Sequence, residues 1–148
     1  MKLAKDLQLA AGARLLAQST MMIMMALGGV MLLAPNIGEK IFYVVYYQDI
    51  VPPADFTEEA RSYIRFTNAV LGAVMIGWMT LTYRLISARQ SVPFPVRSAL
   101  ILSFGSWYVV DTIFSAVHGI WGNVALNTAV AVGILLPLQF GARPGVAD

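Results

Sequence analysis

The apolar positions of this chain gather into long blocks, and most polar positions lie between the blocks. Each block is long enough to cross the roughly 30 Å hydrocarbon core of a membrane as a helix, at about 1.5 Å of rise per residue. The blocks cover about residues 15–34, 63–86, 95–117 and 123–140. We therefore predict an all-α fold, an up-down bundle of four membrane-spanning helices, with residues 1–148 forming a single transmembrane domain.

Helix start signals agree with two of these spans. Asp55 and Thr57 are candidate N-caps ahead of the acidic Glu58, whose charge suits the start of a helix. The second helix is therefore expected to begin near Glu58 and to protrude from the membrane. Pro93 and Pro95 mark the start of the third helix, because proline is tolerated in a first helical turn.

The connection between the third and fourth spans is short. His118 and Gly119 suit the end of the third helix, and Asn123 is a candidate N-cap for the fourth. Pro137 lies in the last turns of the fourth helix, where it predicts a kink.

Residues 36–57 form the only sizeable segment outside the predicted spans. The segment carries an aromatic group, Phe42, Tyr43, Tyr46, Tyr47 and Phe56. Two interpretations stay open: a loop on the membrane surface with one short helix, or a lid over a pocket between the spanning helices.

Composition supports a membrane protein. The chain has 148 residues, 58% of them hydrophobic and 12% charged, with a mean hydropathy of +0.69. Soluble domains carry about 25% charged residues. The absence of cysteine excludes thiol–disulfide relays, iron–sulfur clusters and thiolate metal sites. The ten basic residues lie beside apolar runs, so we read them as orientation signals and expect no nucleic-acid partner.

The charged residues divide between the two ends of the predicted bundle. One end is flanked by basic residues, Lys2, Lys5, Arg14, Arg84, Arg89, Arg97 and Arg143. The other is flanked by acidic residues, Glu39, Asp49, Asp55, Glu58 and Glu59. Because basic loops stay in the cytoplasm, both termini are expected there.

Asp111 is the most informative polar residue. It lies about seven residues from the outer end of the third span, or roughly 10 Å deep at helical rise. A carboxylate at that depth costs about 3 kcal/mol or more unless it is paired, hydrated or protonated. We therefore expect Asp111 to face the interior of the bundle.

Counting turns from the outer surface predicts a polar layer, which comprises Asn68, Asp111 and Asn127. Arg65 lies one turn above and could reach Asp111. The layer has two main interpretations: hydrogen bonds that fix helix register, or the polar anchor of a ligand pocket. A proton or ion path is a third. The candidate ligand-binding residues are Arg65, Asn68, Trp107, Asp111, Ser115, His118 and Asn127.

His118 is the only histidine, at a helix end. It could act as a capping or interfacial group, or it could share acid–base work on one substrate with Asp111. Haem held by two histidines and zinc held by several are excluded within one copy of the chain. We predict no metal, no cofactor and no specific catalytic residue.

The first span is rich in methionine and contains a glycine pair. Methionine packs adaptably, so this side chain serves as a core filler, as a lipid-facing group, or as a surface for a flexible ligand or a partner helix. The methionines are Met21, Met22, Met24, Met25 and Met31. Gly28, Gly29, Gly72 and Gly77 permit close approach between helices, although no GxxxG pair occurs within one helix.

Three segments carry a family resemblance: GVMLLAP at residues 29–35, VLGAVMIGW at 70–78, and WYVVDT at 107–112, which continues to Ser115, Gly119, Asn123 and Asn127. The chain resembles small bacterial DoxX-like membrane proteins. The resemblance implies a four-helix bundle in the bacterial inner membrane and no established reaction.

Our leading functional hypothesis is that the chain binds a lipophilic small molecule, such as a lipid, quinone or isoprenoid, at the polar layer. One alternative is an accessory subunit of a larger membrane complex, with the methionine-rich helix as its contact. Another is a small isomerase or hydrolase that uses Asp111 and His118. Membrane lipids are expected neighbours in each case, and a homo-oligomer stays open.

Overall fold

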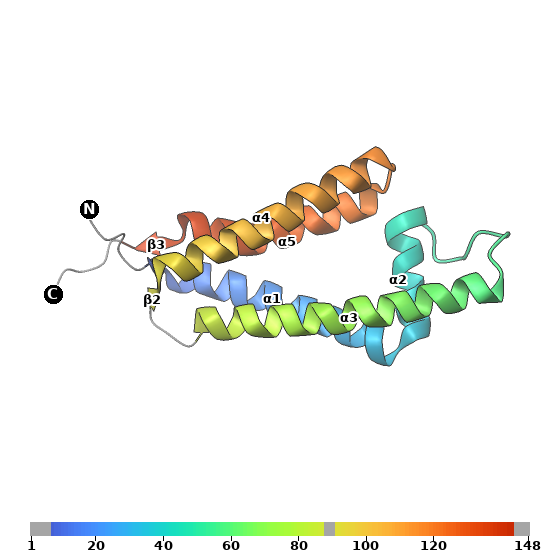
Figure 1. Cartoon of the computed structure of the whole chain (residues 1–148), viewed down its shortest axis with the longest axis horizontal. Coiled ribbons are helices and arrows are strands. Elements are labelled where there is room, and N and C mark those ends of the chain that lie inside the picture. The colour runs from blue at the N-terminus through green and yellow to red at the C-terminus, as the bar shows by residue number, and fades with distance from the viewer. Residues whose placement is uncertain (1–6, 88–90, 144–148) are drawn as a thin grey trace.

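The computed structural model describes residues 7–87 and 91–143. Within these residues the fold is all-α, as predicted. The five helices are α1 (Ala11–Leu33), α2 (Pro35–Tyr47), α3 (Glu58–Ser87), α4 (Phe94–Val117) and α5 (Trp121–Phe140). The long helices run up and down an elongated body, and α2 lies across one end of it (Figure 1). We call this the α2 end, and the opposite one the termini end.

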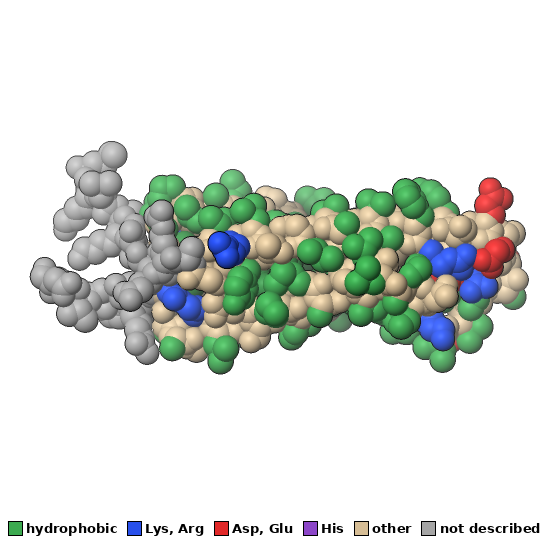
Figure 2. All heavy atoms as spheres, turned by 90° about the horizontal axis from the view of Figure 1, so that it is seen from below, with side chains coloured by type: hydrophobic (Ala, Val, Ile, Leu, Met, Phe, Trp, Pro, Cys, Tyr) green, Lys and Arg blue, Asp and Glu red, His purple; other side chains and the backbone are tan. Residues whose placement is uncertain are grey.

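Four helices are long and apolar enough to cross a membrane: α1, α3, α4 and α5, with mean hydropathies of 1.5 to 1.7. The chain is therefore a multi-pass membrane protein by helix length and hydropathy. Figure 2 shows the matching surface, on which charged side chains gather toward the two ends and apolar side chains occupy the middle.

Most of the predicted helix boundaries are confirmed. The helix α3 begins at Glu58, and the Thr57 hydroxyl accepts a hydrogen bond from the Ala60 amide at 3.2 Å. The helix α4 follows Pro93 and carries a proline in its first turn. It ends at Val117 with His118 as the C-cap, and Gly119 then adopts a φ of +71°, which favours glycine.

The prediction that Asn123 caps α5 is wrong. The tight turn at Gly119 starts α5 earlier, so that Ile120 is the N-cap, without a side-chain cap. The Asn123 amide instead reaches across to Asp111 on α4. A hydrogen bond from an amide to a carboxylate is stronger than one between neutral groups, which explains why Asn123 faces Asp111.

The segment between the first two spans contains α2, which begins one residue after α1 ends. Pro35 occupies its first turn, where a missing N–H costs nothing. Gly38 permits the sharp reversal, because a Cβ there would lie 3.1 Å from the Met31 backbone. Gly122 in the first turn of α5 lies against the Val45 carbonyl. The helix α2 is therefore packed between α3 and α5.

The long helices form two side-by-side pairs, α1 with α3 and α4 with α5. In the first pair the backbones meet at Gly28 and Gly72, as the glycine pattern predicted, whereas Gly29 and Gly77 face open space. The second pair is joined by the short turn at Gly119, and α5 also packs against α1. Figure 1 shows the pairs separating toward the α2 end.

The hydrophobic core fills the half of the bundle nearer the termini end. Its fully buried side chains include Met21, Ile86, Phe104, Ile134 and Leu138. Three very short strands close this end, β1 (Leu7–Leu9), β2 (Ser91–Val92) and β3 (Ala142–Arg143). They pair antiparallel in the order β2-β1-β3, with Leu7 opposite Val92 and Gln8 opposite Arg143. Hydropathy did not indicate these strands, because a strand of two or three residues is too short to show an alternating pattern of apolar and polar positions.

Candidate functional site

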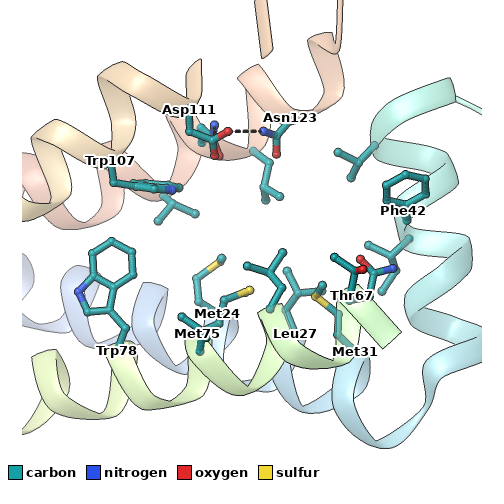
Figure 3. Close-up of a pocket in the computed structure, with 18 of the residues that line it drawn as sticks. Met24, Leu27, Met31, Phe42, Thr67, Met75, Trp78, Trp107, Asp111 and Asn123 are labelled. Carbon is teal, nitrogen blue, oxygen red and sulfur yellow. Dashed lines mark hydrogen bonds between the residues drawn. The ribbon is translucent and has the colours of Figure 1, made fainter. Parts of the chain in front are cut away.

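A cavity of about 350 Å³ lies at the α2 end, where the helix pairs separate. Ligand pockets in proteins measure about 300–1,000 Å³. One wall comes from α1 and α3 and carries Met24, Leu27, Met31 and Met75 (Figure 3). Phe42 and Tyr46 of α2 line the cavity from another side. Two residues of the 36–57 segment thus line the cavity, as the lid interpretation of this segment requires.

An aromatic cluster lies where the cavity meets the core. Trp78 of α3 stacks on Phe104 of α4, with ring centroids 4.4 Å apart and an interplanar angle of 9°. Trp107 meets Trp78 edge to face at 5.9 Å. Both tryptophans line the cavity, and Figure 3 shows their rings one above the other beside the methionines. These contacts join the two helix pairs.

Asp111 lines the opposite wall and accepts hydrogen bonds from two helices. Its Oδ2 accepts one from the Asn127 amide at 3.0 Å, and its Oδ1 accepts one from the Asn123 amide at 3.2 Å. The Ser115 hydroxyl lies 3.5 Å from Oδ1 and itself accepts a bond from Asn123 at 2.8 Å. We call these four residues the Asp111 network.

Helical spacing builds the Asp111 network. Ser115 follows Asp111 by one turn on α4, and Asn127 follows Asn123 by one turn on α5. The short turn at Gly119 brings the two faces together. Asn127 and Ser115 are buried, whereas Asp111 and Asn123 are partly buried and line the cavity.

The predicted contact between Arg65 and Asp111 is wrong. The Arg65 guanidinium instead binds Glu39 of α2 at 3.0 Å and also Glu58 of its own helix. The reason is that α2 covers this face of α3 and brings a carboxylate closer than Asp111. Among the residues that the structure describes, no Lys, Arg or His forms an ion pair with Asp111.

Glu39 is a functional candidate that sequence reasoning missed. Its side chain is buried, and it accepts hydrogen bonds from Arg61 Nε at 2.6 Å, from Arg65 and from the Tyr43 hydroxyl. Burial alone would raise the pKa of Glu39, but the bonds from Arg61, Tyr43 and Arg65 outweigh it and lower the pKa from 4.5 to about 2. The spacing of Glu39 and Tyr43, one helical turn apart, was the available signal.

Asn68 lines the same cavity, but it serves a different contact. Its amide donates a hydrogen bond to the Gly38 carbonyl at 3.2 Å, which holds the start of α2 against α3. The polar layer is therefore divided between two walls: Asn68 on one, and Asp111 with Asn127 on the other.

His118 lies away from the cavity. The imidazole is exposed, its Nδ1 lies 2.8 Å from the Phe114 carbonyl, and its ring stacks on the Phe114 ring at 4.2 Å. Of the other candidates, Trp107, Asp111, Asn68 and Asn127 line the cavity. Ser115 does not line the cavity, but its hydroxyl contacts the Asp111 carboxylate.

The methionines of α1 divide by position. Met24 and Met31 line the cavity, Met21 belongs to the core and Met22 is exposed. Met25 is partly buried, and its sulfur accepts a hydrogen bond from the Thr80 hydroxyl at 3.3 Å. The methionines of α1 therefore include both core filler and cavity-lining side chains.

Fold and site together define a helical multi-pass membrane protein with a largely apolar cavity between its helices and one carboxylate, Asp111, on the cavity wall. No family model, curated protein or solved structure matches the chain. The DoxX-like resemblance stays a prediction.

Proposed function

We propose that this protein binds a lipophilic small molecule, such as a lipid, quinone or isoprenoid, in the cavity at the α2 end. The observation that carries the proposal is a hydrogen-bonded carboxylate, Asp111, on the wall of an otherwise apolar cavity of about 350 Å³. Such a cavity suits a ligand with one polar end. The apolar part of the ligand would lie along Met24, Met75 and Trp107.

The geometry favours binding over acid–base catalysis. The His118 ring faces Phe114 and does not line the cavity, so Asp111 and His118 do not face one ligand there. A role as an accessory subunit draws no support from a specific contact, since exposed apolar side chains on α1 suit lipid equally well.

We expect Asp111→Asn and Asp111→Ala to lose the co-purifying ligand. A hydrogen bond to a charged group contributes about 1.5–3 kcal/mol, so retention should fall at least about tenfold. Mass spectrometry of organic extracts from purified protein measures the retained molecule. His118→Ala is the matched control, because this exposed side chain lies outside the cavity.

The outcome that would refute the proposal is an identical set of lipophilic molecules in wild type and in both Asp111 variants. Circular dichroism and size-exclusion chromatography must show that the variants keep the assembled helices. Loss of ligand in His118→Ala, with retention in both Asp111 variants, would place the binding site near His118 and would also refute the proposal.

We also propose that the protein lies in the bacterial inner membrane with both termini in the cytoplasm. Arg84 and Arg97 lie toward the termini end, and Lys2, Lys5 and Arg89 fall outside the described residues. At the α2 end, the charges of Arg61 and Arg65 are offset by their ion pairs with Glu39 and Glu58.

Reporter fusions test this orientation. Green fluorescent protein should fluoresce when fused to either terminus, and alkaline phosphatase should be active when inserted between α2 and α3 and inactive at either terminus. An active phosphatase at a terminus would reverse the assignment.

A further inference from the structure

We propose that the ligand of this pocket is a lipophilic cation, an amphiphile whose protonated amine or quaternary ammonium group binds beside Asp111. The inference rests on the proposed function and names the class of molecule that the pocket selects. The charged groups around the cavity carry this inference.

The Asp111 network presents only hydrogen-bond donors to the carboxylate. The groups that contact Asp111 are two amides and one hydroxyl, and all three donate to it. Amides and hydroxyls are uncharged, so none of these three contacts brings a positive charge to the carboxylate.

The described part of the chain supplies no counterion to Asp111. The two arginines nearest the α2 end of α3, Arg61 and Arg65, are held by Glu39 and Glu58. The only histidine is turned to Phe114. Asp111 is partly buried, and a carboxylate within a membrane-spanning helix is costly without a partner, so a cation brought by the ligand would offset that cost.

The rest of the cavity also suits a positive charge with an apolar body. Trp78, Trp107, Phe42 and Tyr46 line it, and aromatic ring faces attract ammonium groups. Burial and, second, the charge of Asp111 raise the pKa of Tyr46, which places this phenol within the field of the carboxylate. The methionine thioethers on the facing wall are polarizable and pack against flexible alkyl chains.

Other head groups fit less well. A fatty acid or a phosphate would bring a second negative charge to Asp111, and the described lining contains no Lys, Arg or His to receive it. A neutral alcohol could donate one hydrogen bond to the carboxylate, but it would leave the charge uncompensated. The expected order of affinity is therefore amine, then alcohol, then acid.

Three bromoalkyl probes of equal chain length test this order: a primary amine, an alcohol and a carboxylic acid. The protein is placed in nanodiscs of zwitterionic lipid, and quenching of tryptophan fluorescence reports binding. The chain has three tryptophans, so Trp121→Phe is used as the background and leaves Trp78 and Trp107 to report. Trp121 is exposed at the surface and does not line the cavity.

We expect the amine to bind at least about tenfold more tightly than the alcohol, and the acid to bind weakest. Asp111→Asn should bring the amine and the alcohol to within about twofold of each other, whereas Asp111→Glu should keep the preference for the amine. His118→Ala should leave the order unchanged.

The possible failures are distinguishable. If the amine and the alcohol bind equally in the Trp121→Phe protein, with quenching that Asp111→Ala removes, the charge inference is overturned and the lipophilic pocket stands. If every probe quenches the Asp111 variants as strongly as the parent, the quenching reports membrane partition and both proposals fall.

Discussion

Gly72→Leu should be the most damaging single substitution in the spanning helices, with a loss of roughly 3 kcal/mol or more in the free energy of unfolding. A Cβ at Gly72 would overlap the Gly28 carbonyl oxygen, and a Cβ at Gly28 would lie 2.7 Å from the Gly72 carbonyl oxygen. These neighbours are backbone atoms, which cannot rotate aside. The helices α1 and α3 would have to move apart along their whole contact.

The effect should extend to ligand binding. Leu71 and Met75 flank the crossing on α3, and both line the cavity. Separation of α1 from α3 would therefore change the methionine wall as well as the stability. Unfolding by denaturing detergent in mixed micelles, followed by circular dichroism, measures the stability, and the bromoalkyl amine measures the pocket.

Gly77→Leu is the matched control on the same helix. A Cβ at Gly77 would meet no atom within 4 Å, so the added side chain should enter the surrounding lipid. Replacing glycine inside a helix also stabilises it by roughly 0.5–1 kcal/mol. Equal losses for the two variants would show that the tight crossing between α1 and α3 does not form.

The four spans could be predicted from sequence because the membrane allows few solutions. A run of about 20 apolar residues can satisfy its backbone hydrogen bonds in lipid only as a helix. Local signals then placed the ends, such as Thr57 before α3 and Gly119 after α4. In each case the deciding contacts lie within a few residues.

Polar contacts could also be predicted where the two residues lie close in the chain, and could not be predicted where they lie far apart. Asn127 and Asp111 were predicted at one depth, and they meet because a short turn joins α4 to α5 and leaves little freedom in register. The position of α3 relative to that pair depends on tertiary packing. Depth alone therefore could not assign a partner to Arg65.

The helix α2 is the main element that sequence reasoning could not place. It has 13 residues, too few to span a membrane, and its apolar and polar sides suit a surface loop as well as a lid. Its direction is decided by Pro35 and Gly38, which turn the chain back over α3. Glu39 reaches Arg61 and Arg65 only in that arrangement.

Glu39→Gln should release α2 from α3. It should lower the free energy of unfolding at neutral pH, and this loss should become smaller in acid. Loss of one partner of a buried ion pair costs about 3–5 kcal/mol. The two arginines are partly exposed and keep Glu58, so we expect about 2 kcal/mol at neutral pH. Phe42 and Tyr46 on α2 line the cavity, so affinity for the bromoalkyl amine should fall too.

The lowered pKa of Glu39 determines how its contribution to stability changes with pH. The pKa of Glu39 is about 2 in the folded protein, against an ordinary value of 4.5, so the unfolded chain takes up the proton more readily. The stabilisation is complete above pH 4.5 and is lost as the pH falls toward 2. The difference in unfolding free energy between wild type and Glu39→Gln should therefore shrink over that interval.

Glu59→Gln separates this ion pair from general acid effects, because Glu59 is exposed and forms no ion pair with any described residue. Its unfolding free energy should follow that of wild type at every pH. A difference between wild type and Glu39→Gln that stays constant down to pH 2 would mean that Glu39 is not held as a paired carboxylate. The attachment of α2, and with it one wall of the pocket, would then depend on the hydrogen bond from Asn68 to the Gly38 carbonyl instead.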